Sequence, residues 1–252
     1  MTMARMVTAM ALTLGIGSAT AQADNWAGFY VGIDQRDGSI DRISVVPTGD
    51  ASYAVHVKAS RFGSCDGAHP GAVINGTATV VDASLVASQR ALWCTGPGGD
   101  HLDLNDVTYT LDTETGTLSF PASGRTISVQ RLGPDEAGAD SWAGFYIGID
   151  PHDGSIDRKA ILANDDGTYS IATKSTKFAF CETADPDAIL IDTAQAVDDQ
   201  LVGEAAMARC SASDEMTTRA DGTYIRVADG IIALDIGSDE QPLIHFHRIS
   251  KP

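Results

Sequence analysis

The sequence predicts an all-β protein made of two tandem repeats, each an antiparallel up-and-down barrel of about eight strands. Three observations lead to this fold class. The stretch WAGFYVGIDQRDGSIDR at residues 26–42 returns at residues 142–158 with 14 of its 17 residues unchanged. Both copies then carry runs in which apolar and polar residues alternate, which is typical of half-buried strands. Short turn signals separate these runs, and no convincing amphipathic helix interrupts them.

The repeat sets the expected domain boundaries. A constant offset of 116 places Trp26 on Trp142, and it also places both cysteines of the first copy on those of the second. We therefore expect a first β-barrel repeat over residues 24–132 and a second over residues 142–252. Residues 133–141 (GPDEAGADS) are polar and contain glycine and proline, which predicts a linker between two repeats of ordinary domain size.

Each strand of the expected barrel follows from a local pattern. The first strand, within residues 26–33, has apolar side chains on both faces and glycines that permit bending. Residues 52–58, 107–111 and 127–131 alternate between apolar and other side chains, and residues 244–248 repeat the last of these runs. Strands joined serially by short turns form a meander, which must close or pair its edges. A closed barrel fits best, and a β-sandwich is the alternative.

The N-terminal segment and the cysteines predict an exported protein. Residues 1–23 combine Arg5, a short apolar run and an Ala-x-Ala site, which is typical of a signal peptide. The cysteines form two pairs with the same spacing of 29 positions, so one disulfide inside each copy is the simplest arrangement in an oxidising compartment. We expect a periplasmic or secreted protein without membrane insertion, because no later stretch is long and apolar enough to cross a bilayer. The expected disulfides are Cys65 with Cys94 and Cys181 with Cys210.

The composition argues against some partners. The chain has 34 acidic residues against 17 lysines and arginines, which gives a formal net charge of −17 at pH 7. Such a chain repels nucleic acid and anionic membrane surfaces. We therefore expect no nucleic-acid partner.

Catalytic signatures are absent from the sequence. It contains no nucleophile elbow, zincin helix, P-loop or dinucleotide fingerprint, and no histidine has a histidine counterpart in the other copy. We therefore expect no enzymatic activity, no cofactor and no metal. His245 and His247 share one face of a strand, which is half of a zinc site. The apolar alternation turns both outward, however, and favours an incidental exposed pair.

Aspartates recur around the loop that follows the first strand of each copy. The loop reads DQRDG in the first copy and DPHDG in the second, and its proline and glycine predict a tight hairpin turn. The recurrence also leaves a cation site open, although the spacing departs from the calcium loop of an EF-hand. The aspartates concerned are Asp34, Asp37, Asp41, Asp150, Asp153 and Asp157.

One face of the first strand is a candidate interface. In one interpretation it belongs to a bent strand covered by a neighbouring segment. In the other it docks the two repeats together or docks a partner, because an exposed apolar row marks an interaction site. The residues on this face are Phe29, Val31, Ile33, Phe145, Ile147 and Ile149.

Each copy resembles a calycin-type barrel, the group that contains lipocalins and avidins. The resemblance is carried by a tryptophan that opens the first strand and an arginine near the end of the last strand. It implies that Trp26 packs with Arg131, and Trp142 with Arg248, to close the base of each barrel. The lipocalin order Gly-x-Trp is absent, since Gly28 follows the tryptophan.

Together these features favour an exported binding protein without catalytic activity. Small eight-stranded barrels are either filled by their own side chains or hold one small ligand. A small apolar ligand inside a barrel is the first expectation. The alternative is a protein-interaction or inhibitor module of the bacterial envelope that uses its loops or the first-strand face. The expected partner is therefore an unknown small ligand or an envelope protein.

Overall fold

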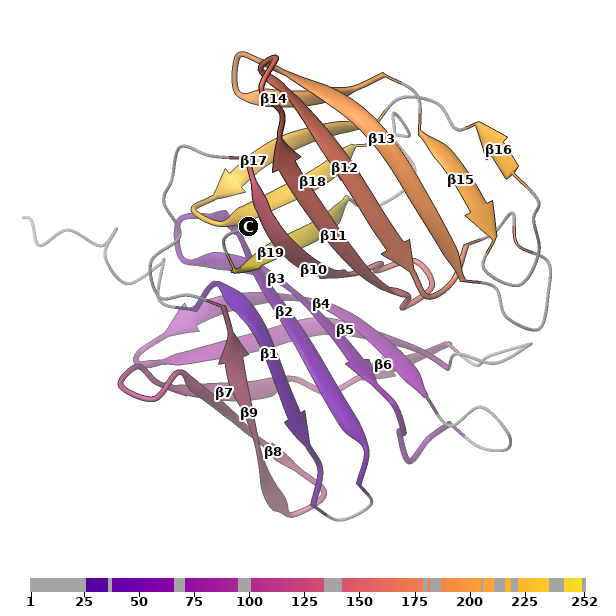
Figure 1. The fold of residues 1–252 in the computed structure, drawn as a ribbon. Helices are drawn as coiled ribbons and strands as arrows, with labels where there is room; N and C mark the ends of the chain where they lie inside the picture. The colour runs from indigo at the N-terminus through magenta and orange to yellow at the C-terminus, as the bar shows by residue number, and fades with distance from the viewer. Residues whose placement is uncertain are drawn as a thin grey trace, which may run out of the picture.

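Two closed antiparallel barrels of eight strands make up the regular structure, as the sequence predicted (Figure 1). No helix in the described part of the chain is long and apolar enough to cross a membrane. The computed structural model describes residues 26–35, 38–65, 71–94, 101–133, 142–178, 181, 187–204, 206–210, 216–218, 222–235 and 243–250. The predicted signal peptide and residues 134–141 of the predicted linker lie outside these ranges.

The first barrel is an up-and-down meander that closes where its first strand pairs with its last. One short strand, β6 (His101–Leu104), lies outside the closed wall and extends the sheet beside β5. The strands of the wall are β1 (Gly28–Ile33), β2 (Ile40–Gly49), β3 (Ser52–Ala59), β4 (Ala72–Val81), β5 (Ser84–Cys94), β7 (Val107–Asp112), β8 (Thr117–Ala122) and β9 (Arg125–Leu132).

The second barrel repeats this wall and closes between β10 and β19. Two short strands, β15 (Met207–Cys210) and β16 (Met216–Thr218), extend the sheet beside β13. The wall consists of β10 (Gly144–Ile149), β11 (Ile156–Ala163), β12 (Thr168–Ser175), β13 (Ala188–Val197), β14 (Gln200–Gly203), β17 (Thr223–Ala228), β18 (Ile231–Asp235) and β19 (Ile244–Ser250).

Glycines in the first strand of each barrel lie against the strand that closes the wall. A Cβ atom on Gly32 would lie 2.6 Å from the carbonyl oxygen of Ser128, and one on Gly148 would lie 2.5 Å from that of His245. Any side chain there would push the first and last strands apart. Closure of the barrel therefore explains why both copies keep these glycines.

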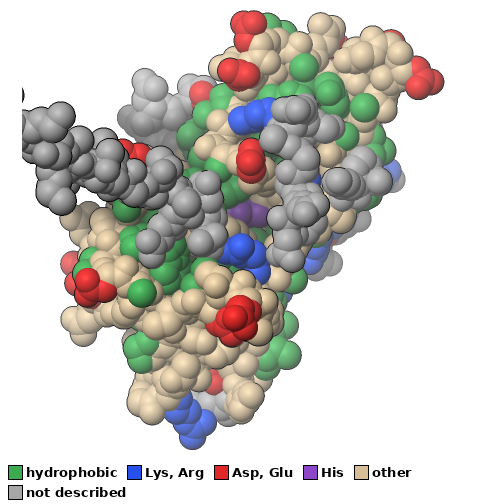
Figure 2. Space-filling model, turned by 90° about the vertical axis from the view of Figure 1, so that its left-hand side faces the viewer, with side chains coloured by type: hydrophobic (Ala, Val, Ile, Leu, Met, Phe, Trp, Pro, Cys, Tyr) green, Lys and Arg blue, Asp and Glu red, His purple; other side chains and the backbone are tan. Residues whose placement is uncertain are grey.

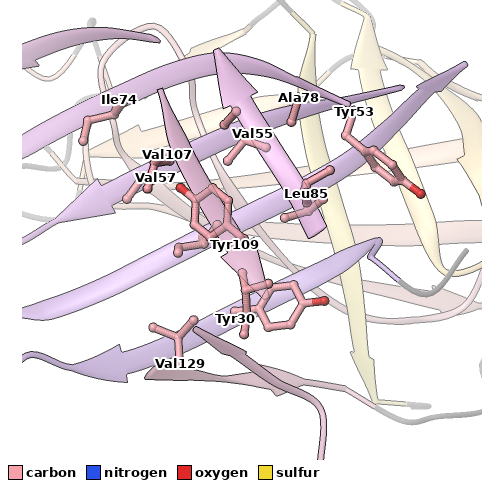
Figure 3. Packing of buried hydrophobic residues seen from close by; sticks show 14 of the residues in the cluster. Tyr30, Tyr53, Val55, Val57, Ile74, Ala78, Leu85, Val107, Tyr109 and Val129 are labelled. Carbon is pink, nitrogen blue, oxygen red and sulfur yellow. The ribbon is translucent and has the colours of Figure 1, made fainter. Parts of the chain in front are cut away.

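The interior of the first barrel is packed with its own apolar side chains. Tyr30, Tyr109 and Leu85 are at most 1% exposed, and Figure 3 shows them converging inside the wall. Their buried area supplies the hydrophobic stabilisation of this barrel. Apolar side chains thus line and occupy the interior of the first barrel.

Both predicted disulfides are confirmed. Cys65 is bonded to Cys94, and Cys181 is bonded to Cys210. Each bond joins the segment after the third strand of its barrel to a strand two or three further along the chain. Two disulfides are compatible with a protein that resides outside the cytoplasm.

Candidate functional site

A tyrosine connects the tryptophan and the arginine that the calycin resemblance pairs in each barrel. In the first barrel the Tyr30 hydroxyl donates to the Trp26 carbonyl oxygen at 2.9 Å. Arg131 donates to the same hydroxyl from Nε at 3.2 Å and from a terminal nitrogen at 2.8 Å. The guanidinium also lies 5.3 Å from the centre of the Tyr30 ring.

The second barrel repeats this connection. Tyr146 donates to the Trp142 carbonyl oxygen at 2.8 Å, and Arg248 donates to the Tyr146 hydroxyl at 3.1 and 3.0 Å. Our sequence reasoning did not single out either tyrosine. The identical spacing of Trp and Tyr in both WAGFY segments was the signal that could have found them.

The two barrels differ most sharply at one interior position. In the first barrel Ile43 lies opposite Tyr30, and in the second Lys159 lies opposite Tyr146. Lys159 is 4% exposed and shares its strand face with the buried Ile161. The second barrel therefore encloses a lysine side chain where the first encloses an isoleucine.

Hydroxyl groups and aromatic rings surround the buried amine. Lys159 Nζ donates to Thr173 Oγ1 at 2.5 Å and to the Tyr224 hydroxyl at 3.0 Å. It also lies 4.6 Å from the ring centre of Phe246 and 4.9 Å from that of Tyr224. Within the described residues, hydroxyls and ring faces rather than a carboxylate hold this ammonium group.

At further positions inside the wall the first barrel has an apolar residue or glycine and the second has a polar or charged one. Arg226 is one example, because its guanidinium lies 4.4 Å from the ring centre of Trp142. The strand pairings place these residues at equivalent positions in the two barrels. The first barrel has Ile43, Val57, Ala59, Gly76 and Leu111 where the second has Lys159, Thr173, Ser175, Asp192 and Arg226.

Asp157 adds a buried carboxyl group to the interior of the second barrel. It is 7% exposed, lies opposite Ser175, and its Oδ1 has no hydrogen-bond partner among the described residues. Burial raises its pKa to about 6, against the opposing effects of the Ser175 hydrogen bond and the Lys159 charge. The interior thus holds a cation and a titratable acid in one hydrophobic wall.

The second aspartate loop forms the predicted tight turn, and the ends of the first loop are joined by the equivalent hydrogen bond. The Gly38 amide donates to the Asp34 carbonyl oxygen and the Gly154 amide to that of Asp150, both at 2.8 Å. Gly38 and Gly154 have φ angles of 72° and 70°, which glycine adopts readily.

The carboxylates of the second loop bind its own backbone. Asp150 accepts from the His152 amide, and Asp153 accepts from the Ser155 amide. Asp37 lies outside the described residues, and Asp41 is buried like Asp157. No three His, Cys, Asp or Glu side chains in the described ranges gather where they could hold a metal ion.

The first-strand face lies at the contact between the barrels, but unequally in the two copies. Phe29 is fully buried and packs in one cluster with Ile147 and Ile149, and Val31 packs against this cluster. By contrast, the equivalents of Phe29 and Ile149 remain open to solvent, since Phe145 is 40% exposed and Ile33 is 63% exposed. The contact thus uses different parts of the two first-strand faces, which overlap at the equivalent residues Val31 and Ile147.

Histidines line the same contact. His247 Nε2 lies 2.7 Å from Ser44 Oγ across the two barrels, and the rings of His56 and His245 stack with centres 6.1 Å apart. Figure 2 shows histidine side chains at the waist between the two lobes. The expectation of an exposed histidine pair is wrong, because His247 is only 3% exposed. Both histidines do point out of their own barrel, but the first barrel covers that surface.

An amide relay orients one of these imidazoles. Asn75 donates through Nδ2 to the Pro151 carbonyl oxygen at 2.7 Å, which leaves Oδ1 facing His56 Nδ1 at 2.8 Å. His56 therefore carries its proton on Nδ1. Burial lowers the pKa of His56, and it lowers that of His245 to about 4 and that of His247 to about 3. The contact is built from neutral imidazoles at neutral pH.

Comparison with known proteins gives no relative: the chain matches no family model, no curated protein and no solved structure.

Proposed function

We propose that the protein is an exported, non-catalytic binding protein whose second barrel holds one small ligand. The observation that carries this proposal is the buried Lys159 at the position of Ile43. The first barrel closes around an apolar side chain there, so the fold itself does not require a charge. Burying an ammonium group costs free energy, and among the described residues no carboxylate lies within salt-bridge distance of Lys159 to offset that cost. A costly group of this kind is typical of a functional site.

The surroundings of Lys159 indicate the class of ligand. A lysine ammonium has three donors, and Thr173 and Tyr224 use two of them. The remaining donor suits a carbonyl or carboxylate oxygen. The rings of Tyr224 and Phe246 suit an apolar body. We therefore expect a small, mainly apolar molecule with one acceptor group, bound in the second barrel only.

Native mass spectrometry of the gently purified full chain tests this function. We expect the wild-type protein to carry additional bound mass, and we expect Lys159→Ile to lose it. This substitution installs the residue of the first barrel, so the wall tolerates it. Lys177→Ile is the matched control, because it removes the same charge from a side chain that is 55% exposed. Equal bound mass on Lys159→Ile, or none on the wild type, contradicts the proposal.

A second candidate function is a protein-interaction module of the envelope. The observation that favours it is a set of exposed large apolar side chains on the outer wall of the second barrel, including Ile191 at 61% and Met207 at 45%. Exposed apolar patches on a soluble protein mark interaction sites. Immobilised protein with and without Ile191→Asp should differ in what it retains from an envelope extract, and identical recovery counts against this function.

A further inference from the structure

A row of four side chains on the outer wall of the first barrel forms its side of the contact with the second barrel. The row runs across β1 to β4 in register, because each member lies opposite the next on the neighbouring strand. All four of its members contact β19 or the loop after β10 directly. We call this set the docking row: Phe29, Ser44, His56 and Asn75.

The second barrel carries the same row, shifted by 116 positions, and there it is uncovered. The pairing register again joins each member to the next across β10 to β13 and then to β15. Phe145 is 40% exposed, Ile191 is 61% exposed and Met207 is 45% exposed. Every member is apolar. We call this set the open row: Phe145, Ala160, Ala172, Ile191 and Met207.

The docking row packs against a face of the second barrel, and the equivalent face of the first barrel is largely uncovered. On the second barrel this face includes the buried Ile147, Ile149 and Ile156. On the first barrel Ile33, the equivalent of Ile149, is 63% exposed, and Leu132, the equivalent of Ile249, is 38% exposed. Val31, the equivalent of Ile147, already packs against the contact between the barrels. We call this set the open face: Ile33, Ile40 and Leu132.

A surface hollow of about 180 Å³ adjoins the open face. Its lining includes Ile33 and Ile127 together with polar residues of the β8–β9 hairpin such as Arg125. The open face is thus an apolar surface with a recess beside it, which offers room for a large side chain from a partner.

The contact between the barrels is heterologous, because it joins two largely different faces of one repeated unit, which overlap at Val31 and its equivalent Ile147. A heterologous contact leaves one unused copy of each face at the two ends, and repeating it builds rings or open chains. Here the unused copies are the open row and the open face. In Figure 1 the strands of the open row, β10 to β13 and β15, lie on the upper barrel, and the strands of the open face, β1, β2 and β9, lie on the lower one.

We propose that the protein binds further copies of itself head to tail, with the open row of one chain docked on the open face of the next. This inference develops the second candidate function and does not depend on a ligand in the second barrel. Both surfaces are apolar, so their burial drives association. The net charge of −17 opposes it at low ionic strength, and salt should therefore strengthen it.

Sedimentation of the full chain over a range of concentrations tests this proposal at about 0.15 M salt. We expect the average mass of the wild type to rise with concentration to twice the mass of one chain and beyond. Ile33→Asp and Ile191→Asp should each remain monomeric at the same concentrations. Both side chains are exposed, so both variants should keep the wild-type melting temperature.

Mixing the two variants gives the sharpest result. The Ile33→Asp chain keeps its open row, and the Ile191→Asp chain keeps its open face, so one intact contact remains between them. We expect the mixture to form dimers and nothing larger. Val197→Asp is the control, because this 50% exposed side chain lies outside both surfaces and should leave association unchanged.

Three outcomes overturn the proposal: a wild type that stays monomeric, a mixture that stays monomeric, or a Val197→Asp chain that is disrupted as strongly as the others. A monomeric wild type would leave the open row to a different protein. Lys159→Ile should associate like the wild type, so a failure of the ligand proposal and a failure of this one are distinguishable.

Discussion

Lys159 occupies in the second barrel the interior position that Ile43 occupies in the first. Each lies opposite the tyrosine of its own first strand, Tyr146 or Tyr30. One wall therefore closes around an ammonium group in one copy and around an aliphatic side chain in the other. The difference separates what the barrel needs for folding from what one copy has gained in addition.

Lys159→Ile should stabilise the protein. Replacing a buried charged group by a hydrophobic side chain of similar volume is often neutral or stabilising by about 1–4 kcal/mol. Thermal and urea unfolding should show a higher midpoint for the variant. The reverse change, Ile43→Lys, should lower the midpoint strongly because the first barrel offers no prepared hydroxyls. A marked loss of stability in Lys159→Ile would show that the lysine has a structural role.

Tyr146→Phe should destabilise the second barrel. The change removes the acceptor of the Arg248 hydrogen bonds and the donor to the Trp142 carbonyl oxygen. Leaving these groups unsatisfied costs about 1–3 kcal/mol. Tyr30→Phe should cost less, because Arg131 is half-buried whereas Arg248 is 8% exposed. Urea denaturation of both variants checks the order, and a larger loss in Tyr30→Phe contradicts it.

Acidification should weaken the contact between the barrels. The pKa of His245 is about 4 and that of His247 about 3 in the folded protein, against an ordinary value of 6.5. The unfolded chain therefore binds protons first, so stability is complete above pH 6.5 and falls as the pH drops towards the folded values. Between pH 6.5 and its folded pKa, each histidine that stays uncharged in the folded protein lowers the free energy of unfolding by about 1.4 kcal/mol per pH unit.

A swap variant isolates the effect of these histidines. The double variant His245→Ser with His247→Gln gives these two positions the residue types that the first barrel has at the equivalent Ser128 and Gln130. The raised pKa of Asp157 acts in the opposite direction, since its contribution is lost as the pH rises through about 6, but it is common to both proteins. Unfolding midpoints at about pH 7 and about pH 5 should differ less for the swap than for the wild type. Equal differences would contradict the histidine account.

Reduction should destabilise both barrels. Each disulfide spans a sequence separation of 29 residues. In the chain-entropy account a loop of this length contributes about 3.5 kcal/mol by restricting the unfolded chain. Unfolding with and without a phosphine reductant should show a lower midpoint in the reduced protein. The double variant Cys65→Ala with Cys94→Ala should lose only the stabilisation that the disulfide of the first barrel provides. An unchanged unfolding midpoint in this variant would contradict the contribution of the disulfide.

The barrel walls and the disulfides could be predicted because local signals carry them. Period-2 alternation marks each strand, and the shared spacing of 29 makes one disulfide inside each copy the simplest pairing of the cysteines. The unequal burial of Phe29 and Phe145 could not be predicted in this way, because the motif around them is nearly identical. Their fates depend on residues of other strands, such as Ser44 and His56, whose equivalents are alanines.

The polar interior of the second barrel left a signal that sequence reasoning did not use. Lys159 lies between Asp157 and Ile161 in the alternation that continues the opening motif, where the first copy has Ile43 between Asp41 and Val45. Comparing inward positions copy by copy would have found it. The opening motif is nearly identical in the two copies and reflects their shared geometry, whereas the chemical difference between the two interiors lies just beyond it.

The most direct measurement of the central claim is a high-resolution crystal structure of the protein purified without harsh washing. The account predicts electron density for a non-protein molecule within hydrogen-bond distance of Lys159 Nζ, and none inside the first barrel. An interior of the second barrel filled by its own side chains and water alone would contradict it.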